Sequence, residues 1–374
     1  GNRPAVSVCA LVPYPPNTAP SQRYRIEQWL PHLNGRGIIM DLFPFADLEL
    51  MELLHKPGRR LDKAGLILSA CARRFGTSGF AARNYDAVVI HRGISLAGPA
   101  LIETALAMLG TRVIFDFDDA IYLLHTTDAN KRFGWLKFPG KTAAICRLSN
   151  HVVVGNSYLA SYARGFNRNV TVVPTSVDTA RYKPAGRPSQ SGKPGKVIVG
   201  WTGSSTSQTH LEMFSPMLAR LTAIPNVELR VISDRQPVLP GVKHVWRPWS
   251  SSTEIEELAP FDIGIMPMPD DEWSKGKCSL KALVYMAMGI PAVCSPVGAN
   301  LDIIRHGVNG MLASPDDEWI ENLTALVESP DLRKTMGALG RKTVVERFSM
   351  KRSADLFADV ILDTVKGRST VIRD

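Results

Sequence analysis

Short apolar runs alternate with longer amphipathic segments along almost the whole chain, and this alternation constrains the fold more than any other feature. The longer segments carry apolar residues at helical spacing, as at Ile26, Trp29, Leu30 and Leu33. Strands that alternate with helices form parallel sheets covered by helices on both faces, so the predicted fold class is α/β. The expected strands lie within 5–14, 38–45, 85–93, 112–119, 151–157, 170–178, 197–205, 227–234, 262–269, 291–298 and 309–314.

A single linker-like segment, KPAGRPSQSGKPGK at 183–196, interrupts the alternation. A chain of 374 residues is also too long for one ordinary hydrophobic core. We therefore expect two Rossmann-like, doubly wound domains over 1–190 and 191–349, followed by an amphipathic helix over 350–374. Ligands of such sheets bind beyond the carboxyl ends of the strands, which makes the cleft between two facing domains the default active site.

The composition is that of a soluble globular protein, with 45% hydrophobic and 21% charged residues. No apolar run approaches the roughly 20 residues that span a bilayer, and no signal-peptide pattern is visible. The five cysteines are scattered and lack metal-ligand spacing. We therefore expect reduced thiols in a cytoplasmic protein.

The net charge of +9 is concentrated in the first half of the chain. Residues 1–190 hold 23 Lys and Arg against 13 Asp and Glu, a balance of +10, and the remaining residues hold 21 against 22, a balance of −1. The densest basic stretch, Lys56–Arg83, interleaves its cations with apolar residues and has few aromatics to stack on bases. It therefore indicates either an anionic membrane surface as a partner or a solvated helix face, and it argues against nucleic acid.

The segment KGKCSLK is expected to form a loop and the start of a helix. It contains three lysines, Lys275, Lys277 and Lys281. Cations in a first helical turn oppose the helix dipole, so they are unfavourable there unless an anion is bound. Free N–H groups at the helix start would contact the same anion, and a diphosphate fits this arrangement. The alternative is a solvated lysine-rich loop.

Two further stretches of the second half follow expected strands. Gly203, Ser204 and Ser205 form a turn whose backbone and hydroxyls suit a phosphate, although an ordinary capped strand-to-helix turn has the same residues. Gly298 and Asn300 precede a short helix, where they would either contact sugar hydroxyls or simply cap the helix.

The run SLKALVYMAMGIPAVCSPVGANLDIIRHGVNGMLASPDD resembles the donor-binding signature of glycosyltransferase family 4, a branch of the GT-B glycosyltransferases. HVVVGNSYLASYA with VTVVPTSVDTARYKP, and ESPDLRKTMGALGRKTVVERFS, are similar to other parts of that family. The resemblance implies a GT-B fold, a nucleotide-diphosphate sugar bound by the second domain and an acceptor bound by the first. It also implies transfer with retention, no metal or other cofactor, and a closing helix that returns to the first domain.

The chain departs from the family pattern at two positions. Gly276 and Val284 stand where members often carry two glutamates, one of which touches the sugar and the other the ribose. Neither residue can accept those hydrogen bonds. Ribose recognition must then come from elsewhere, and a non-catalytic member of the family is an alternative.

In the first domain, the resemblance directs attention to FDFDDAIY, where a polar residue at the strand end faces the acceptor. Asp118 and Asp119 are the candidates for orienting the acceptor hydroxyl or taking its proton. The Asp116–Asp118 pair also imitates the metal-binding Asp-x-Asp of the other glycosyltransferase fold, an interpretation that the doubled α/β layout argues against. Helix capping, or pairing of the acids with Arg92, is the structural alternative.

Three other residues join this candidate site. His91, beside Arg92 at the end of the neighbouring strand, is a further catalytic candidate, although a lone His is more often structural. Arg23 and Arg25 follow the first strand and, with Arg92, would hold an acceptor phosphate or the donor diphosphate, or pair with Glu27. The resemblance therefore implies a retaining, metal-independent hexosyltransferase, and the basic Lys56–Arg83 stretch favours a glycan or lipid-linked acceptor, as in cell-surface glycan assembly. A GT-B sugar-nucleotide epimerase and a non-catalytic nucleotide-sugar binding protein remain as alternatives.

Overall fold

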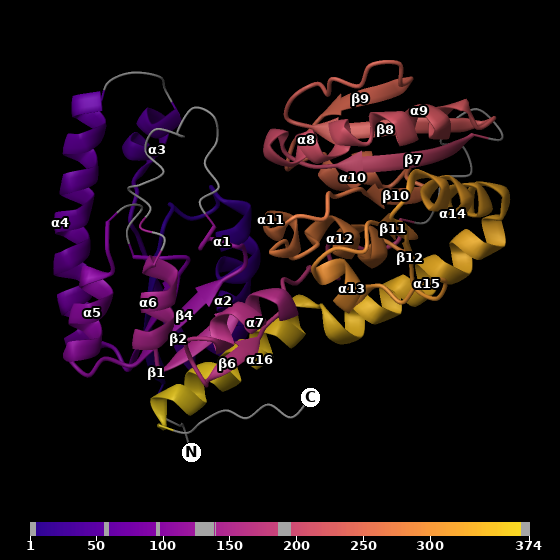
Figure 1. Ribbon diagram of the computed structural model, residues 1–374. Coiled ribbons are helices and arrows are strands. Elements are labelled where there is room, and N and C mark those ends of the chain that lie inside the picture. Colours follow the sequence, from indigo (N-terminus) through magenta and orange to yellow (C-terminus); the bar gives the residue numbers. More distant parts are fainter. Residues whose placement is uncertain are drawn as a thin grey trace. The chain divides into compact units, whose positions relative to one another are not determined.

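The computed structural model describes residues 5–55, 60–94, 98–123, 138, 140–185 and 196–367 (Figure 1). The chain divides into two compact units, Gly1–Thr175 with Met350–Asp374, and Ser176–Ser349. The first boundary lies before the predicted position at 190 because Val177 already pairs with the second unit, where its N–H donates to Phe348 O at 3.0 Å. Tyr182 likewise belongs to a hydrophobic core of the second unit.

The first unit is built on a six-stranded parallel sheet in the order β2-β1-β3-β4-β5-β6. The register pairs Val8 with Met40 of one neighbour and Ala87 of the other, so the carboxyl ends of β1, β2 and β3 lie at the same edge of the sheet. The strands are β1 (Val6–Val12), β2 (Ile38–Pro44), β3 (Ala87–His91), β4 (Val113–Phe117), β5 (His151–Val154) and β6 (Val170–Val172).

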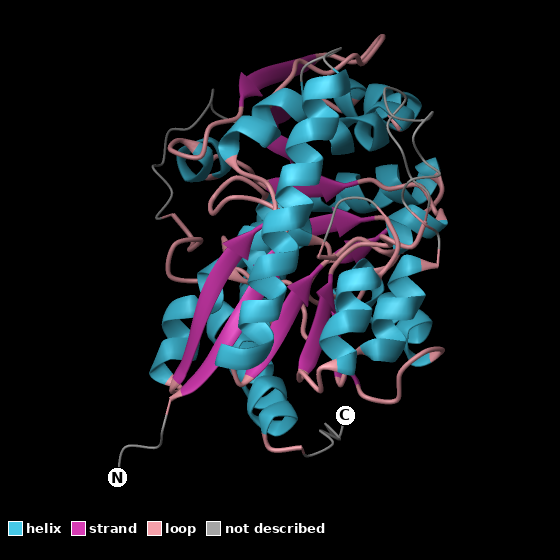
Figure 2. Ribbon diagram, turned by 90° about the vertical axis from the view of Figure 1, so that its left-hand side faces the viewer, coloured by secondary structure: helices cyan, strands magenta, loops and turns pink. Residues whose placement is uncertain are grey.

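Helices cover both faces of this sheet (Figure 2). The amphipathic segment with helical spacing at Ile26, Trp29, Leu30 and Leu33 is divided at Ile26 into α1 (Pro20–Arg25), η1 (Glu27–Trp29) and α2 (Leu30–Gly35). The closing helix α16 (Met350–Val365) packs Phe357 against Trp29, with ring centroids 5.2 Å apart, and so belongs to the first unit. The other helices are α3 (Leu48–His55), α4 (Arg60–Asn84), α5 (Leu101–Met108), α6 (Lys141–Leu148) and α7 (Ser157–Arg164).

The second unit repeats the plan with a sheet in the order β12-β11-β10-β7-β8-β9, again entirely parallel. Its edge strand β9 was not among the predicted strands, because HVWRP lacks a continuous apolar run. The strands are β7 (Val197–Thr202), β8 (Val227–Ser233), β9 (His244–Pro248), β10 (Ile263–Met266), β11 (Ala292–Cys294) and β12 (Met311–Leu312).

The central helix of the second unit is α12 (Leu280–Ala287), which is buried from Ala282 onward. Tyr285 fixes it to the sheet, since its hydroxyl accepts a hydrogen bond from Thr202 N at 2.9 Å. The other helices are α8 (Ser205–Met213), α9 (Ser215–Ala223), α10 (Glu254–Leu258), α11 (Glu272–Lys275), α13 (Ala299–Ile303), α14 (Asp316–Glu328) and α15 (Pro330–Arg347). The predicted α/β class with two Rossmann-like domains is confirmed. In the described part of the chain, no helix is both long enough and apolar enough to cross a bilayer.

Candidate active site

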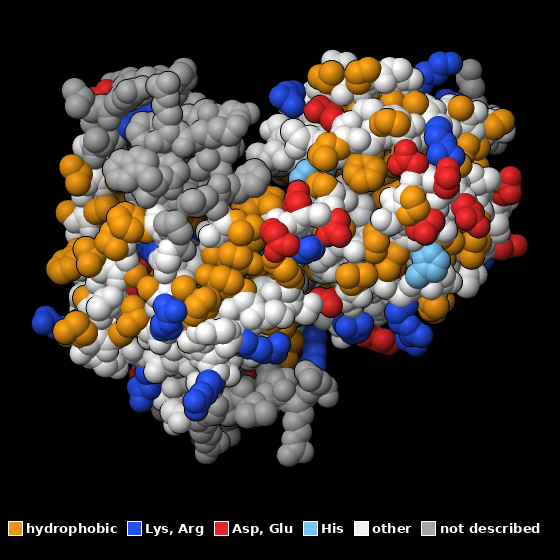
Figure 3. Space-filling view, in the orientation of Figure 1, with side chains coloured by type: hydrophobic (Ala, Val, Ile, Leu, Met, Phe, Trp, Pro, Cys, Tyr) orange, Lys and Arg blue, Asp and Glu red, His pale blue; other side chains and the backbone are white. Residues whose placement is uncertain are grey.

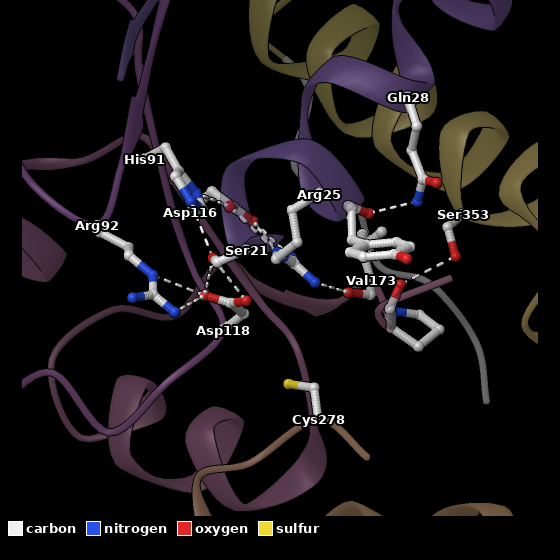
Figure 4. Close-up of polar contacts among 12 residues, drawn as sticks. Ser21, Arg25, Gln28, His91, Arg92, Asp116, Asp118, Val173, Cys278 and Ser353 are labelled. Carbon is white, nitrogen blue, oxygen red and sulfur yellow. Dashed lines mark hydrogen bonds and ion pairs between the residues drawn. The ribbon is translucent and has the colours of Figure 1, made fainter. Parts of the chain in front are cut away.

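The carboxyl edge of the first sheet holds a chain of alternating acids and bases (Figure 4). His91 is the last residue of β3, Asp116 lies within β4, and Asp118 directly follows β4. Ser21 and Arg25 come from α1, the helix that follows β1. Parallel strands end at a common edge, so residues distant in sequence meet at this point.

Asp116 is completely buried and engages two bases. Arg25 Nη2 lies 2.5 Å from Asp116 Oδ1, and His91 Nδ1 lies 2.7 Å from Asp116 Oδ2. Arg25 also donates from Nη1 to Val173 O at 2.7 Å. Arg25, itself fully buried, is therefore committed to the fold and is not available to a phosphate, contrary to its predicted role. The same contacts occupy both oxygens of Asp116, the first acid of the Asp-x-Asp pattern in the sequence.

Ser21 connects this pair to the predicted catalytic acid. Its Oγ lies 2.7 Å from each carboxylate oxygen of Asp118 and 3.2 Å from His91 Nε2. The Ser21 hydroxyl is half-buried, whereas His91 has no exposed surface. His91 thus contacts the site through Ser21, and its buried position suits orienting a neighbour rather than touching a substrate.

Arg92 holds both candidate acids in place. Its Nε donates to Asp118 Oδ1 at 2.9 Å, and its Nη2 donates to Asp119 Oδ2 at 2.8 Å. The Arg92 backbone adopts a left-handed conformation with φ of 61°, which is uncommon for a residue with a side chain. Pairing of Arg92 with the acids, the structural alternative considered from the sequence, is therefore what the structure contains.

The electrostatics of the site keep Asp116 and Asp118 ionised. Burial alone would raise the pKa of Asp118, but the charges of Arg92, His91 and Arg25 outweigh it and hold that pKa well below its ordinary value. The pKa of Asp116 is likewise lowered, because Arg25 and His91 outweigh the effect of burial. A general base works best with a pKa near the operating pH, so Asp118 is suited to accepting a hydrogen bond and poorly suited to taking a proton.

Arg23 completes the predicted group in the first unit. Its side chain is half-buried, and its guanidinium carbon lies 4.8 Å from the centroid of the Tyr24 ring. Glu27, its expected partner, instead accepts hydrogen bonds from Asn17 N and Gln22 Nε2. Arg23 thus remains a candidate for an anionic ligand.

In the second unit, Lys281 lies at the start of α12, and its Nζ is 5.2 Å from the centroid of the Trp201 ring at the end of β7. A Cβ on Gly203 would lie 2.5 Å from the Trp201 ring and 2.7 Å from Lys281 Cε, so glycine lets this turn lie close to both side chains. Burial, followed by the charge of Lys277, lowers the pKa of Lys281 to about 8. Among the described residues, no carboxylate lies within ion-pairing distance of Lys281.

The other two lysines differ in their surroundings. Lys277 Nζ lies 4.5 Å from the centroid of the Trp273 ring. Lys275, in contrast, pairs with Glu272 at 2.9 Å and with Asp270 at 3.5 Å. Two acids already neutralise Lys275, which weakens its predicted role as a diphosphate ligand.

The predicted phosphate turn is partly occupied by a residue of the chain itself. Asp234, which directly follows β8, accepts hydrogen bonds from Ser205 N at 2.5 Å and from Ser205 Oγ at 2.9 Å. A carboxylate at the N-terminus of α8 satisfies the donors that a phosphate would use. Gly203, which lies close to Lys281, and the exposed Ser204 are the parts of this turn that Asp234 does not contact.

The predicted sugar-binding residues Gly298 and Asn300 have structural roles. Gly298 has φ of 57°, and a Cβ there would lie 2.5 Å from Lys275 O. Asn300 is completely buried and donates from Nδ2 to Ser295 O at 2.8 Å. Its Oδ1 is buried and has no hydrogen-bond partner among the described residues, so the predicted sugar contact of Asn300 stays a prediction.

The start of α12 is locally strained. Ser279, its N-cap residue, has φ of 57°, is nearly fully buried and makes no side-chain cap. Its Oγ lacks a hydrogen-bond partner among the described residues. Strain and unsatisfied polar atoms of this kind cluster at functional sites, and here they adjoin the two lysines that contact indole rings.

The second unit contains a recognisable family segment. Residues 196–329 match the family model described as Glycosyl transferases group 1. The alpha-1,3/1,6-mannosyltransferase ALG2 of Mus musculus is 36% identical over 84 residues, which cover 22% of this chain and 19% of the mouse protein. Its Homo sapiens counterpart is 37% identical over 68 residues, or 18% of this chain and 16% of that protein. The chain thus matches less than a fifth of the length of these relatives.

Solved structures resemble the chain over nearly its whole length. Sucrose-phosphate synthase from Thermosynechococcus elongatus gives a TM-score of 0.70 at 13% identity, covering 97% of this chain and 100% of that one. HepE from Anabaena, in complex with UDP and glucose, gives 0.65 at 15% identity, covering 96% and 100%. A glycosyltransferase from Rickettsia africae gives 0.67 at 13% identity, covering 97% and 99%. These likenesses show that the chain has the GT-B fold of glycosyltransferases.

Proposed function

We propose that the chain is a retaining glycosyltransferase of family 4, which moves a hexose from a nucleotide-diphosphate sugar to an acceptor hydroxyl. The observation that carries the proposal is Lys281, a partly buried cation at the start of α12 whose pKa is lowered to about 8. An anion bound there would stabilise the charged lysine and use the free N–H groups of the helix start. The group 1 match over 196–329 covers this site, and the HepE structure contains UDP and glucose.

The donor is assigned to the second unit, where Lys277, Lys281, Gly203 and Ser204 would hold the diphosphate. When the bond from the sugar to the diphosphate breaks, negative charge develops on the departing oxygen. Lys281 neutralises that charge without a metal ion. Backbone groups near Gly298 would contact the sugar.

The acceptor is assigned to the first unit, where Asp118 and Asp119 would accept a hydrogen bond from the attacking hydroxyl. Because Asp118 has a lowered pKa, it orients this hydroxyl rather than removing its proton. The proton passes to the departing diphosphate oxygen as the new glycosidic bond forms. Arg23 would bind a phosphate of the acceptor.

The basic first half of the chain supports an anionic, lipid-linked or glycan acceptor, as in cell-surface polysaccharide assembly. It also supports a cytoplasmic protein that is peripheral on the inner face of the membrane. The densest predicted basic stretch begins at Lys56, and residues 56–59 lie outside the described residues. Within the described part, Arg74 is buried and donates to Val12 O and Phe43 O, so it adds nothing to the exposed charge.

Calorimetric titration with UDP, GDP, ADP and their hexose conjugates tests the donor assignment. We expect one nucleotide to bind, and the matching nucleotide sugar to be consumed only when an acceptor is added. Interconversion of nucleotide sugars without an acceptor would favour the epimerase alternative. Binding without turnover of any donor, across a panel of lipid-linked and free glycan acceptors, would favour a non-catalytic binding protein, and no binding at all would contradict the proposal.

A further inference from the structure

The sheet of the second unit places three different residues at successive strand ends. Strands β7, β8 and β9 are neighbours in that sheet, and Figure 1 shows them side by side. Gly203 directly follows β7, Asp234 follows β8 and Trp249 follows β9. Gly203 N donates to Ile232 O at 3.0 Å. Trp249 N donates to Ser233 O, also at 3.0 Å, so the three residues follow one another along the carboxyl edge.

Asp234 presents an exposed carboxylate in a fixed orientation. Its Oδ1 accepts a hydrogen bond from Ser205 N at 2.5 Å, and its Oδ2 accepts one from Ser205 Oγ at 2.9 Å. Each oxygen of a carboxylate can accept two hydrogen bonds. Asp234 can therefore accept a hydrogen bond from a ligand while it keeps both contacts with the start of α8.

Trp249 presents an exposed aromatic ring next to Asp234 on the same edge, with 38% of its surface exposed. Its indole N–H donates to Glu254 Oε1 at 3.4 Å. Glu254 is itself held by the Tyr182 hydroxyl, which donates to its Oε2 at 2.7 Å. These contacts hold one edge of the indole, and an exposed ring of this kind is a surface on which a nucleobase can stack.

The position of Asp234 suits contact with a ribose. In dinucleotide-binding sheets that begin with the same strand-helix-strand unit, an acid at the end of the second strand accepts a hydrogen bond from the ribose 2′-hydroxyl. Asp234 follows β8, the second strand of this sheet along the chain. Val284 on α12 cannot supply such a contact, because it is apolar, 4% exposed and part of a hydrophobic core.

We propose that Asp234 and Trp249 bind the nucleoside of the donor, with the carboxylate accepting from the ribose 2′-hydroxyl and the indole stacking on the base. The inference rests on the proposed function, in which Lys281 and Gly203 lie at the diphosphate. Neighbouring strands are about 4.8 Å apart, so diphosphate, ribose and base would follow the ends of β7, β8 and β9 in that order. A carboxylate next to the diphosphate would repel it, whereas a position one strand away suits the uncharged ribose.

Titration calorimetry with matched nucleotides tests the ribose contact. The probes are UDP, GDP and ADP, each measured beside its 2′-deoxy counterpart. We expect the wild type to bind the preferred nucleotide about 10- to 100-fold more tightly than the deoxy form, the range of a hydrogen bond to a charged group. In Asp234→Ala this ratio should fall below about threefold. Asp234→Asn keeps an acceptor for the start of α8 and should give an intermediate ratio.

The base contact and the general charge of the unit are tested separately. Trp249→Ala should weaken binding of both nucleotide forms by roughly tenfold, because stacking does not involve the hydroxyl, and Trp249→Phe should restore most of the affinity. Asp331→Asn removes an equal charge from the first turn of α15 and should leave the ratio unchanged. Figure 3 shows acidic side chains spread over the second unit, so the loss of one carboxylate alters its general charge little.

The outcomes separate this inference from the proposed function. Equal binding of a nucleotide and its deoxy form by the wild type would overturn the ribose assignment and leave the proposed function standing. A wild-type ratio in both Asp234 variants, with folding confirmed by circular dichroism, would do the same. Wild-type affinity in Trp249→Ala would overturn the stacking on the base. If the wild type bound none of the nucleotides, the proposed function would fail together with this inference.

Discussion

The two candidate sites differ in how their charges are balanced. In the first unit, Asp116 lies between Arg25 and His91, and Asp118 pairs with Arg92, so each of these carboxylates has a basic neighbour. In the second unit, Lys277 and Lys281 lie near each other and contact the indole rings of Trp273 and Trp201. The pKa of Asp118 is lowered, which favours its charged form, whereas the lowered pKa of Lys281 disfavours its charged form.

This difference separates a site that is already assembled from one that gains stability when a ligand arrives. Opposite charges in the first unit hold the carboxylates in fixed orientations before any substrate binds. The second unit keeps a cation in an environment that penalises its charge, so an anion improves the site. Orientation of an uncharged hydroxyl requires the first kind of site, and capture of a diphosphate favours the second.

Removing Arg25 tests whether the first site is held together by its charge balance. Arg25→Met leaves Asp116 buried beside His91 alone, and breaking a buried ion pair in this way costs about 3–5 kcal/mol. We expect a loss of this size in the free energy of unfolding measured by urea denaturation. The control is Arg36→Met, which breaks surface pairs with Asp355 and Asp359 and should cost less than about 1 kcal/mol. If the free energy of unfolding fell by less than about 1 kcal/mol in both variants, the buried pair would contribute no more stability than the surface pairs do.

Removing Lys281 tests the second site, where we expect a loss of nucleotide affinity without a loss of stability. Lys281→Met deletes a penalised cation, so the free energy of unfolding should not fall. The affinity for the nucleotide diphosphate should fall about 10- to 100-fold, the range of a hydrogen bond to a charged group. Lys275→Met, whose lysine is neutralised by Glu272 and Asp270, should change affinity by less than about threefold. If both variants lost affinity for the nucleotide diphosphate to a similar extent, Lys275 would contribute to the diphosphate site as much as Lys281 does.

The pH dependence of nucleotide binding sharpens the comparison further. Lys281 is charged in the free protein below its pKa of about 8 and becomes neutral above it. Binding of an anion above that pH requires uptake of a proton, so the Kd should rise by up to about tenfold per pH unit. Asp118, with its lowered pKa, stays ionised over this range. Titration calorimetry between about pH 7 and 9.5 measures how steeply the Kd rises with pH. The Lys281→Arg variant stays charged over this range, so its Kd should change much less with pH. An equal slope in both proteins would assign the titration to another group.

Much of the fold could be predicted because strand and helix periods are local properties of the sequence. Strand β9 was not predicted because its residues are only partly buried and contain no apolar run. The division of the first helix at Ile26 was also missed, since helical spacing continues through Trp29 and Leu33. These are places where tertiary packing, rather than local pattern, decides the backbone.

The candidate sites were predictable in position but not in pairing. Parallel strands end at one edge, so Asp118 and Lys281 could be placed near sheet ends from the sequence alone. The partner of Arg25 could not, because Asp116 lies 91 positions away. The pairing of Lys275 with Glu272 was accessible, since residues three apart on a helical turn are neighbours. The contact of Asp234 with Ser205 depended on the loop geometry after β8, which no motif in the sequence indicated.

Ser21 gives the smallest expected effect and tests whether the first site orients a substrate. Ser21→Ala removes the hydroxyl between Asp118 and His91 but leaves Asp118 paired with Arg92. The free energy of unfolding should fall by about 1 kcal/mol, the value of an ordinary hydrogen bond. The kcat of transfer should fall about tenfold with an unchanged KM for the donor, because a misoriented carboxylate raises the barrier without touching the diphosphate. Ser21→Thr, which keeps the hydroxyl, should restore most of the rate. A loss of stability with no change in kcat would limit Ser21 to a structural role and leave Asp118 oriented by Arg92 alone.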